Sequence, residues 1–340
     1  MLRLPRFRLH RPSTLDEALA CLAEAGPDGR LIAGGTDLLP NMKHELATPA
    51  TLVALSAVRE LSGIRRDPDG GLVIGAMTTI AAVAASEDVR AGAPALAQAA
   101  SLVASPQIRR MGTIGGNVLL DTRCQWYNQT YFWRSAIGFC LKKDGAECHV
   151  VAGGSRCVAA ASSDTAPALM TLRASLDVAG RHGRRQVPID RFWTSDGVRN
   201  HRLGDDEILV SIIIPKTPAG HRGAYGKLRD RGAIDYPLLG VAARLDLDGD
   251  GMVQQADLVL TALAAIPRRV TSADALLRGT RPGTPGFAGQ MDEVADRAFR
   301  QCHPLENIAG DADWRREMIR VYVRRTLEAA ASGGGPVHHL

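Results

Sequence analysis

Four of the six cysteines in this chain of 340 residues fall within one short segment, where they could hold a metal. Cys124, Cys140, Cys148 and Cys157 are separated by fifteen, seven and eight residues. This is neither the paired C-x-x-C spacing of zinc ribbons nor the short steps of ferredoxins. Four thiolates are nevertheless what a tetrahedral zinc ion or a [4Fe–4S] cluster requires. The residues therefore predict a four-thiolate centre and leave zinc, iron–sulfur and reduced structural thiols as alternatives.

The surroundings of these cysteines favour a shielded centre. Aromatic side chains, scarce elsewhere in the chain, concentrate between residues 126 and 133, and an apolar wall excludes water from a metal centre. His149 is expected to point away from the centre or to cap it. The remaining cysteines, Cys21 and Cys302, are expected to be ordinary reduced thiols.

Two glycine-rich segments could bind phosphate groups. In Ile32-Ala33-Gly34-Gly35-Thr36-Asp37, consecutive glycines between an expected strand and an expected helix can turn their N–H groups toward one anion. A helix N-terminus behind the loop adds partial positive charge. The pattern is neither the dinucleotide-binding G-x-G-x-x-G nor a P-loop, and a lone Gly-Gly pair is more often a tight turn. A second loop, residues 113–117 (TIGGN), is also expected to be flanked by strands, so that both loops grip one dinucleotide-like ligand.

The elements that must position these residues are predicted from apolar periodicity and capping signals. Expected helices cover residues 13–25, 38–46, 80–85, 95–104 and 163–172, with three more near residues 273, 292 and 314. Expected strands cover residues 30–33, 51–55, 71–75, 175–178, 208–214, 241–247 and 253–261. This mixture predicts an α+β chain whose N-terminal part is α/β. Residues 215–220 read as a linker and residues 331–340 as a frayed tail.

The segment from Asp246 to Gly251 resembles the start of a calcium-binding EF-hand loop, with Asp246, Asp248, Asp250 and Gly251 at the matching positions. The twelfth position of that loop would be Asp257 in place of the bidentate glutamate, and the flanking residues are expected to be strands. The segment therefore predicts a hairpin turn.

Charge and composition exclude two classes of partner. The formal net charge of +5 comes mostly from arginines scattered singly or in pairs, and aromatic residues make up 4% of the chain. Both features argue against a nucleic-acid groove. No apolar run reaches the ~20 residues of a membrane span, and the N-terminal residues build no export signal. We expect a cytoplasmic protein with no nucleic-acid partner and no membrane, whose reduced thiols favour metal over disulfides.

Five motifs, taken in order, carry a family resemblance. They are IAGGTDLLP (32–40), TIGGN (113–117), SSD (162–164), DEILVSIIIP (206–215) and AYGKLRDRGAIDYPL (224–238). Together they resemble the FAD-binding medium subunits of molybdenum hydroxylases, the xanthine dehydrogenase and CO dehydrogenase superfamily, over residues 5–330. The insertion DTRCQWYNQ (121–129) with its later cysteines resembles the β subunits of 4-hydroxybenzoyl-CoA reductases, which carry a [4Fe–4S] cluster beside FAD.

The resemblance implies a fold and a set of site residues. It implies a two-part FAD-binding domain of the vanillyl-alcohol-oxidase/CO dehydrogenase flavoprotein type over residues 1–215, with parts 1–58 and 59–215 and a cluster insertion at about 121–160. A smaller α+β domain would follow at 216–330. The implied FAD contacts are Ala33, Gly34, Gly35, Thr36, Asp37, Leu38, Thr113, Gly116, Asn117, Asp164, Leu209 and Lys227. The implied cluster ligands are Cys124, Cys140, Cys148 and Cys157.

The resemblance also implies a function. The chain would pass electrons between FAD and iron–sulfur centres, with no catalytic residue of its own for the organic substrate. Its partners would be a molybdenum-cofactor large subunit, a small subunit with two [2Fe–2S] clusters, and ferredoxin or another redox carrier, in a dimer of heterotrimers. The expected reaction is reductive dehydroxylation of 4-hydroxybenzoyl-CoA. The alternatives are an aldehyde- or N-heterocycle-oxidising molybdenum hydroxylase and a non-redox binding module with a zinc-stapled loop.

Overall fold

The computed structural model describes residues 2–338, which begin with a small α/β unit. Its three parallel strands lie in the order β1-β3-β2. The first helix begins at a capping box in which Thr14 and Glu17 satisfy each other's backbone N–H groups, as the sequence predicts. The elements of this unit are β1 (Arg8–His10), α1 (Leu15–Ala25), β2 (Gly29–Ile32), α2 (Leu38–Lys43) and β3 (Thr51–Ala54).

The second unit is an antiparallel sheet of five strands covered by short helices. Its strand order is β4-β5-β8-β6-β7. The strands are β4 (Ile64–Arg66), β5 (Leu72–Gly75), β6 (Ser175–Gly180), β7 (Gly183–Pro188) and β8 (Ile208–Ile214). The helices are α3 (Ile80–Ala85), α4 (Glu87–Gly92), α5 (Pro94–Ser101), α6 (Pro106–Met111), α7 (Ile114–Val118) and α9 (Thr165–Thr171).

A third unit follows the segment at residues 215–220, which has no regular structure, as predicted for a linker. Its antiparallel sheet has the order β12-β11-β10-β9. The elements are β9 (His221–Leu228), β10 (Leu239–Leu247), β11 (Val253–Thr261), β12 (Arg268–Arg269), α10 (Ala273–Leu277), α11 (Pro285–Gln301) and α12 (Ala312–Ser332). The turn between β10 and β11 is the predicted hairpin, in which Asp248 accepts bonds from the N–H groups of Asp250 and Met252.

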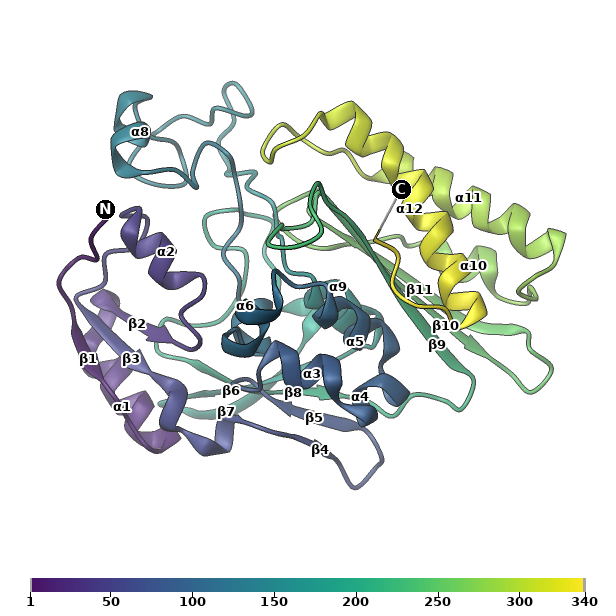
Figure 1. Cartoon of the computed structure of the whole chain (residues 1–340), viewed down its shortest axis with the longest axis horizontal. Coiled ribbons are helices and arrows are strands. Elements are labelled where there is room, and N and C mark those ends of the chain that lie inside the picture. Colours follow the sequence, from purple (N-terminus) through teal and green to yellow (C-terminus); the bar gives the residue numbers. More distant parts are fainter. Residues whose placement is uncertain (1, 339–340) are drawn as a thin grey trace.

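The helices of the second unit lie between the two antiparallel sheets, as Figure 1 shows for α5 and α9. Tyr225, Ala242 and Val259 of the third unit belong to the same buried core as these helices. The opposite face of β9–β11 is covered by α11 and α12. The whole chain is therefore a layered α+β structure, which confirms the predicted class. None of the helices within residues 2–338 is long and apolar enough to cross a membrane.

Two local expectations differ from the structure. The second glycine loop is not flanked by strands: it follows α6 and forms the first turn of α7, because Thr113 caps that helix by accepting the N–H of Gly116. The predicted frayed tail is partly ordered, since Val337 pairs with β9 through bonds to Tyr225 and Lys227. The last two residues of that predicted tail lie outside the described residues.

Candidate functional site

The first glycine loop is pressed against the end of α6. A Cβ atom on Gly34 would lie 1.8 Å from the carbonyl oxygen of Met111, so no side chain fits there. Gly35 takes a positive φ of 71°, which glycine adopts without strain. The loop leads into α2, whose N-cap residue is Asp37. Its backbone is thus open to a ligand on one side and fixed by backbone packing on the other.

The second glycine loop is fixed by Ala76, which directly follows β5, and by residues at and just before the start of α9. Gly115 donates its N–H to Ala76, and its Cα approaches that residue so closely that a Cβ would lie 2.7 Å from the Ala76 methyl group. The side-chain oxygen of Asn117 accepts bonds from Ser163 (2.9 Å) and from the Thr165 hydroxyl (2.7 Å). These bonds set the orientation of the Asn117 amide at the border of the cavity.

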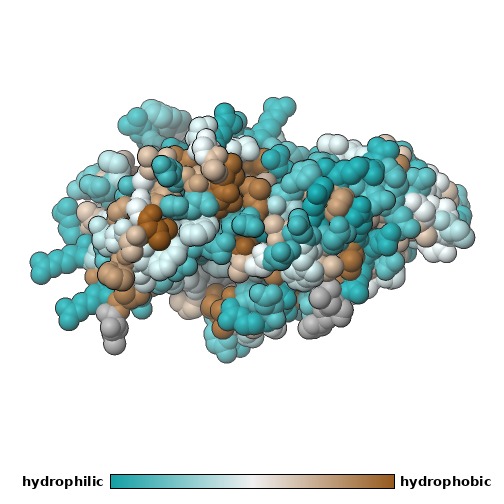
Figure 2. Space-filling view, turned by 90° about the horizontal axis from the view of Figure 1, so that it is seen from above, coloured by the Kyte–Doolittle hydropathy of each residue, from teal (hydrophilic) through white to brown (hydrophobic). Residues whose placement is uncertain are grey.

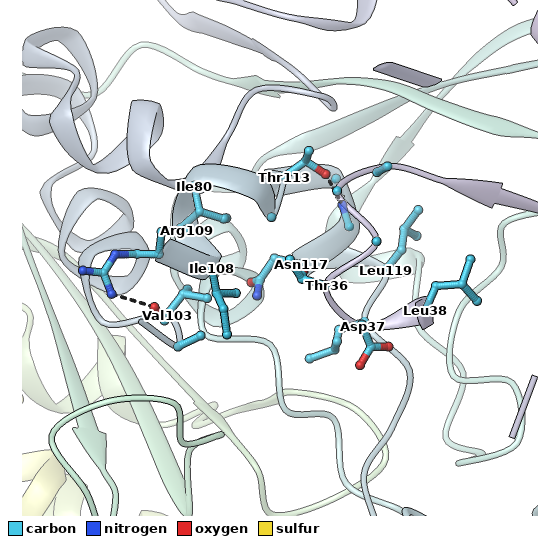
Figure 3. A pocket seen from close by; sticks show the side chains of 18 of the residues that line it. Thr36, Asp37, Leu38, Ile80, Val103, Ile108, Arg109, Thr113, Asn117 and Leu119 are labelled. Atoms are coloured by element: carbon cyan, nitrogen blue, oxygen red, sulfur yellow. Dashed lines mark hydrogen bonds between the residues drawn. The ribbon is translucent and has the colours of Figure 1, made fainter. Parts of the chain in front are cut away.

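Both loops line one cavity of about 440 Å³, a size typical of small-molecule and cofactor sites. All of the predicted FAD contacts except Lys227 line it: Ala33, Gly34, Gly35, Thr36, Asp37, Leu38, Thr113, Gly116, Asn117, Asp164 and Leu209. Figure 3 shows Thr36 and Asn117 close together at its centre, with Ile108 beside them. Arg109 also borders the cavity, but its guanidinium turns aside to donate to the carbonyl of Val103 at 2.7 Å.

Lys227 contacts the cavity only through Asp164. It is fully buried on β9, and its Nζ donates to Asp164 (2.9 Å) and to the carbonyl of Leu102 (3.0 Å). The hydroxyl of Tyr225 donates to the other oxygen of Asp164 at 2.9 Å. Burial raises the pKa of Asp164 above its ordinary value, and the charge of Lys227 works in the opposite direction.

The four predicted metal ligands line a second, much smaller hollow together with Trp126, Tyr127 and His149. Cys124, Cys140 and Cys157 are buried, Cys148 is half-buried, and none of them is in a disulfide. Within residues 2–338, no group of three or more His, Cys, Asp or Glu side chains is arranged closely enough to hold a metal ion. His149 is turned to the backbone, where its Nε2 contacts the carbonyl of Phe139.

The chemistry of this donor set suits a metal that binds thiolates. Burial raises the pKa of Cys124 to about 11 and also raises that of Cys157, so both thiols are protonated at neutral pH in the chain alone. A metal would have to displace these protons, as it does at thiolate sites generally. One N–H, that of Ala159, already points at the sulfur of Cys157.

A loop between β9 and β10 contributes cavity residues that the sequence analysis missed. Ile234, Asp235 and Tyr236 line the cavity, and the N–H of Ile234 donates to Ala104 at 3.0 Å. The segment belongs to the AYGKLRDRGAIDYPL motif. Nothing in the spacing of that motif predicts that Tyr236 contacts Asp37 in the first glycine loop, 199 positions earlier in the chain. Ile108, Arg109 and Val103 were missed for the same reason, because they reach the cavity through tertiary packing.

Comparison with known proteins shows the family. A family model described as the FAD binding domain in molybdopterin dehydrogenase matches residues 5–217, and the CO dehydrogenase flavoprotein C-terminal domain matches residues 223–330. The chain belongs to this family. It is 32% identical to the carbon monoxide dehydrogenase medium chain of Hydrogenophaga pseudoflava, over 96% of this chain and 97% of that one. It is 34% identical to the aldehyde oxidoreductase FAD-binding subunit of Escherichia coli, over 88% of this chain and 91% of that one.

The solved structures agree with this assignment. Carbon monoxide dehydrogenase from Hydrogenophaga pseudoflava matches with a TM-score of 0.79 at 31% identity, over 97% of this chain and 99% of that chain. Quinoline 2-oxidoreductase from Pseudomonas putida matches with a TM-score of 0.75 at 26% identity, over 97% and 99% of the two chains. The chain is therefore an FAD-binding subunit of an oxidoreductase of the molybdenum hydroxylase family. The names of these relatives cover several substrates and do not select one for this chain.

Proposed function

We propose that this chain is an FAD- and [4Fe–4S]-containing electron-transfer subunit of the 4-hydroxybenzoyl-CoA reductase type. The observation that carries the proposal is the convergence of four cysteines, from one insertion of about forty residues, on a single hollow. Family membership accounts for FAD but does not require those cysteines. Thiols gathered behind an aromatic wall in a chain that binds a redox cofactor favour an iron–sulfur cluster over a structural staple.

The cavity between the glycine loops is the proposed FAD site. The backbone N–H groups of Gly34 and Gly35 and the hydroxyl of Thr36 would hold the diphosphate, because glycine loops leave such donors exposed. Gly116 lines the same cavity, but its N–H is bonded to Thr113. Apolar residues of the cavity lining, among them Ile80 and Leu209, would pack against the flavin ring. Bound FAD exchanges one or two electrons, so it can connect a two-electron reaction with one-electron carriers.

The hollow in the insertion is the proposed cluster site, with Cys124, Cys140, Cys148 and Cys157 as ligands. A bound [4Fe–4S] cluster would carry single electrons. The chain's own residues shield this site. Trp126 packs 6.0 Å from Trp133 and 5.4 Å from His149 between ring centroids, and Lys142 lies 4.7 Å from the ring of Tyr127. Lys142 is held there by bonds to Asp121 and Thr122.

The substrate reaction would take place on partner chains. Relatives named as medium chains support a large and a small partner subunit, which we propose to carry a molybdenum cofactor and two [2Fe–2S] clusters. We further propose ferredoxin or another redox carrier as the electron donor and a dimer of heterotrimers as the assembly. In Figure 2, hydrophobic side chains gather in the middle and left half of the face seen from above. Tyr131 and Phe132 on α8 (Tyr131–Ala136) expose 47% and 82% of their surfaces, and exposed apolar patches are typical of such interfaces.

The cluster can be tested directly. Anaerobically purified protein is expected to contain FAD and close to four iron atoms per chain, and the Cys140→Ser variant is expected to lose the iron while still being able to bind FAD. Cys21→Ser is the matched control, because Cys21 lies on α1 far along the chain from the insertion. Iron content near four in Cys140→Ser would show that the ligand assignment is wrong. Colourless protein with one zinc would favour the binding-module alternative.

A second candidate is an aldehyde- or N-heterocycle-oxidising enzyme, which the aldehyde oxidoreductase and quinoline 2-oxidoreductase relatives support. The purified complex separates the two. Reduced viologen should be reoxidised by 4-hydroxybenzoyl-CoA if electrons flow inward. Dye reduction by aromatic aldehydes or N-heterocycles, without turnover of the thioester, would favour the oxidising enzyme.

A further inference from the structure

Arg123 connects the cysteine insertion with the cavity. Its backbone exchanges two hydrogen bonds with Ala160, of 2.8 and 2.7 Å, and this pairing joins the start of the insertion to its end. The residue immediately precedes Cys124 in the chain. Its position therefore depends on how the two ends of the insertion are held together.

The side chain of Arg123 reaches out of the insertion to two loops that line the cavity. The guanidinium pairs with the carboxylate of Asp37 in the first glycine loop and with the hydroxyl of Tyr236 in the β9–β10 loop. It also lies 4.3 Å from the centroid of the Tyr236 ring. The Tyr236 hydroxyl in turn contacts Asp37 at 3.3 Å. The Arg123 side chain is only 11% exposed, whereas the Asp37 side chain is 28% exposed and Tyr236 43%.

The charges of Asp37 and Arg123 are the reason to expect that their contact would affect FAD binding. Asp37 places a negative charge in the loop proposed to hold the diphosphate, where it would repel that ligand. Arg123 neutralises this charge with a planar cation that also stacks on Tyr236. Without Arg123, the Asp37 carboxylate would keep its bonds to Asn41 and Tyr236 but lose the cation that pairs with it, and the loop that carries Tyr236 would lose a support.

We infer that Arg123 is a positioning residue that couples the two proposed cofactor sites, so that a folded, metal-loaded insertion tightens FAD binding. The inference rests on the proposed function, because it needs both sites. Coupling of this kind is a free energy shared between two ligands, and it acts equally in both directions. Loss of the metal should loosen the insertion, release Arg123 and weaken FAD binding.

The test compares the FAD dissociation constant, measured by flavin fluorescence, in full-length wild type, Arg123→Met, Cys140→Ser and the double variant. Arg123→Met should keep its iron and bind FAD roughly tenfold more weakly, as expected for loss of a charge-assisted bond. Cys140→Ser should weaken FAD in the same direction. The double variant should bind no more weakly than the weaker single variant, because both substitutions remove one contact. Arg123→Lys, which keeps the charge but not the planar stacking, should be intermediate.

Arg109→Met is the matched control, because Arg109 borders the same cavity but donates to the carbonyl of Val103 and is not bonded to Asp37 or Tyr236. Its effect on FAD binding should be the same with and without Cys140→Ser. Unchanged FAD affinity in iron-loaded Arg123→Met, or effects of Arg123→Met and Cys140→Ser that multiply, would overturn the coupling while leaving the proposed function intact. Wild-type protein without iron or any other metal would overturn both.

Discussion

Lys227 is a cation that the fold keeps entirely away from water. Its charge is balanced by Asp164, which lines the cavity, and Tyr225 bonds the same carboxylate. An ion pair this deep is held at a large desolvation cost, so removing one partner is far more damaging than removing both. The pair fixes Asp164 at the edge of the cavity and joins β9 of the third unit to α9 of the second.

The Lys227→Met variant should therefore be less stable than wild type by about 3–5 kcal/mol near neutral pH. Burial already raises the pKa of Asp164, so its ionisation costs stability as the pH rises. Without Lys227 this cost is not offset, and the deficit should narrow as the pH falls and Asp164 becomes protonated. Urea unfolding between pH 4.5 and 8 measures the trend. A double variant, Lys227→Met with Asp164→Asn, should recover part of the stability, and a deficit independent of pH would contradict the argument.

The first glycine loop shows how an element boundary makes a binding surface. The chain leaves β2, makes one turn through Gly34 and Gly35, and enters α2, so that this turn lines the cavity. This is possible because Gly34 has no side chain between its backbone and Met111. The geometry belongs to the loop and α6 together, and neither would form the cavity wall alone.

Gly34→Ala should accordingly lose most of its FAD. The added methyl group would overlap the backbone of Met111, which forces the loop or α6 to move and costs about 1–3 kcal/mol of stability. Gly289→Ala is a matched control in the middle of α11, where a Cβ meets nothing within 4 Å. That substitution should raise stability by about 0.5–1 kcal/mol and leave FAD bound. Flavin absorbance per chain measures the FAD content, and chemical denaturation measures the stability. A Gly34→Ala protein with full flavin content would show that close packing of Gly34 against Met111 is not needed for FAD binding.

Local signals predicted elements where local chemistry decides them. The capping box at Thr14 predicted α1, and the apolar run at residues 208–214 predicted β8, because both depend on neighbouring residues. The helix expected over 38–46 ends at Lys43, since Glu45 takes a positive φ of 57°. The strand β9 was missed because its glycines and polar residues mask the alternation.

The residues of the site also fall into those that local sequence indicates and those that only tertiary packing brings in. The residues of the two glycine loops could be named from the sequence, because consecutive glycines mark an anion-binding backbone. The partners that shape the cavity could not: Met111 closes the loop behind Gly34, and Arg123 pairs with Asp37 across 86 positions of the chain. Such contacts depend on how three units pack, which no local spacing encodes.

At the scale of the molecule, the insertion is held by the third unit. The backbone N–H of Gln125 donates to the carbonyl of Asn307 at 2.7 Å, and the side chain of Asn307 donates back to the carbonyl of Val158. Asn307 is fully buried, and Val158 directly follows Cys157. The loop before α12 thus grips both ends of the cysteine segment, although it is far from it in sequence.

The Asn307→Ala variant should consequently release its iron faster. Removing the side chain leaves the partly buried Val158 carbonyl without this donor, and a penalty of this kind makes local opening around Cys157 roughly tenfold more frequent. Iron release to a chelator, followed by absorbance, should accelerate by a similar factor, with the initial iron and FAD contents close to wild type. Glu306→Gln is the matched control, because Gln125 bonds the backbone oxygen of Glu306 and not its exposed side chain. If Asn307→Ala and Glu306→Gln released iron at the same rate, the Asn307 side chain of the third unit would not be needed to keep the insertion closed. The cysteines would then depend on pairing within the insertion itself, between Arg123 and Ala160.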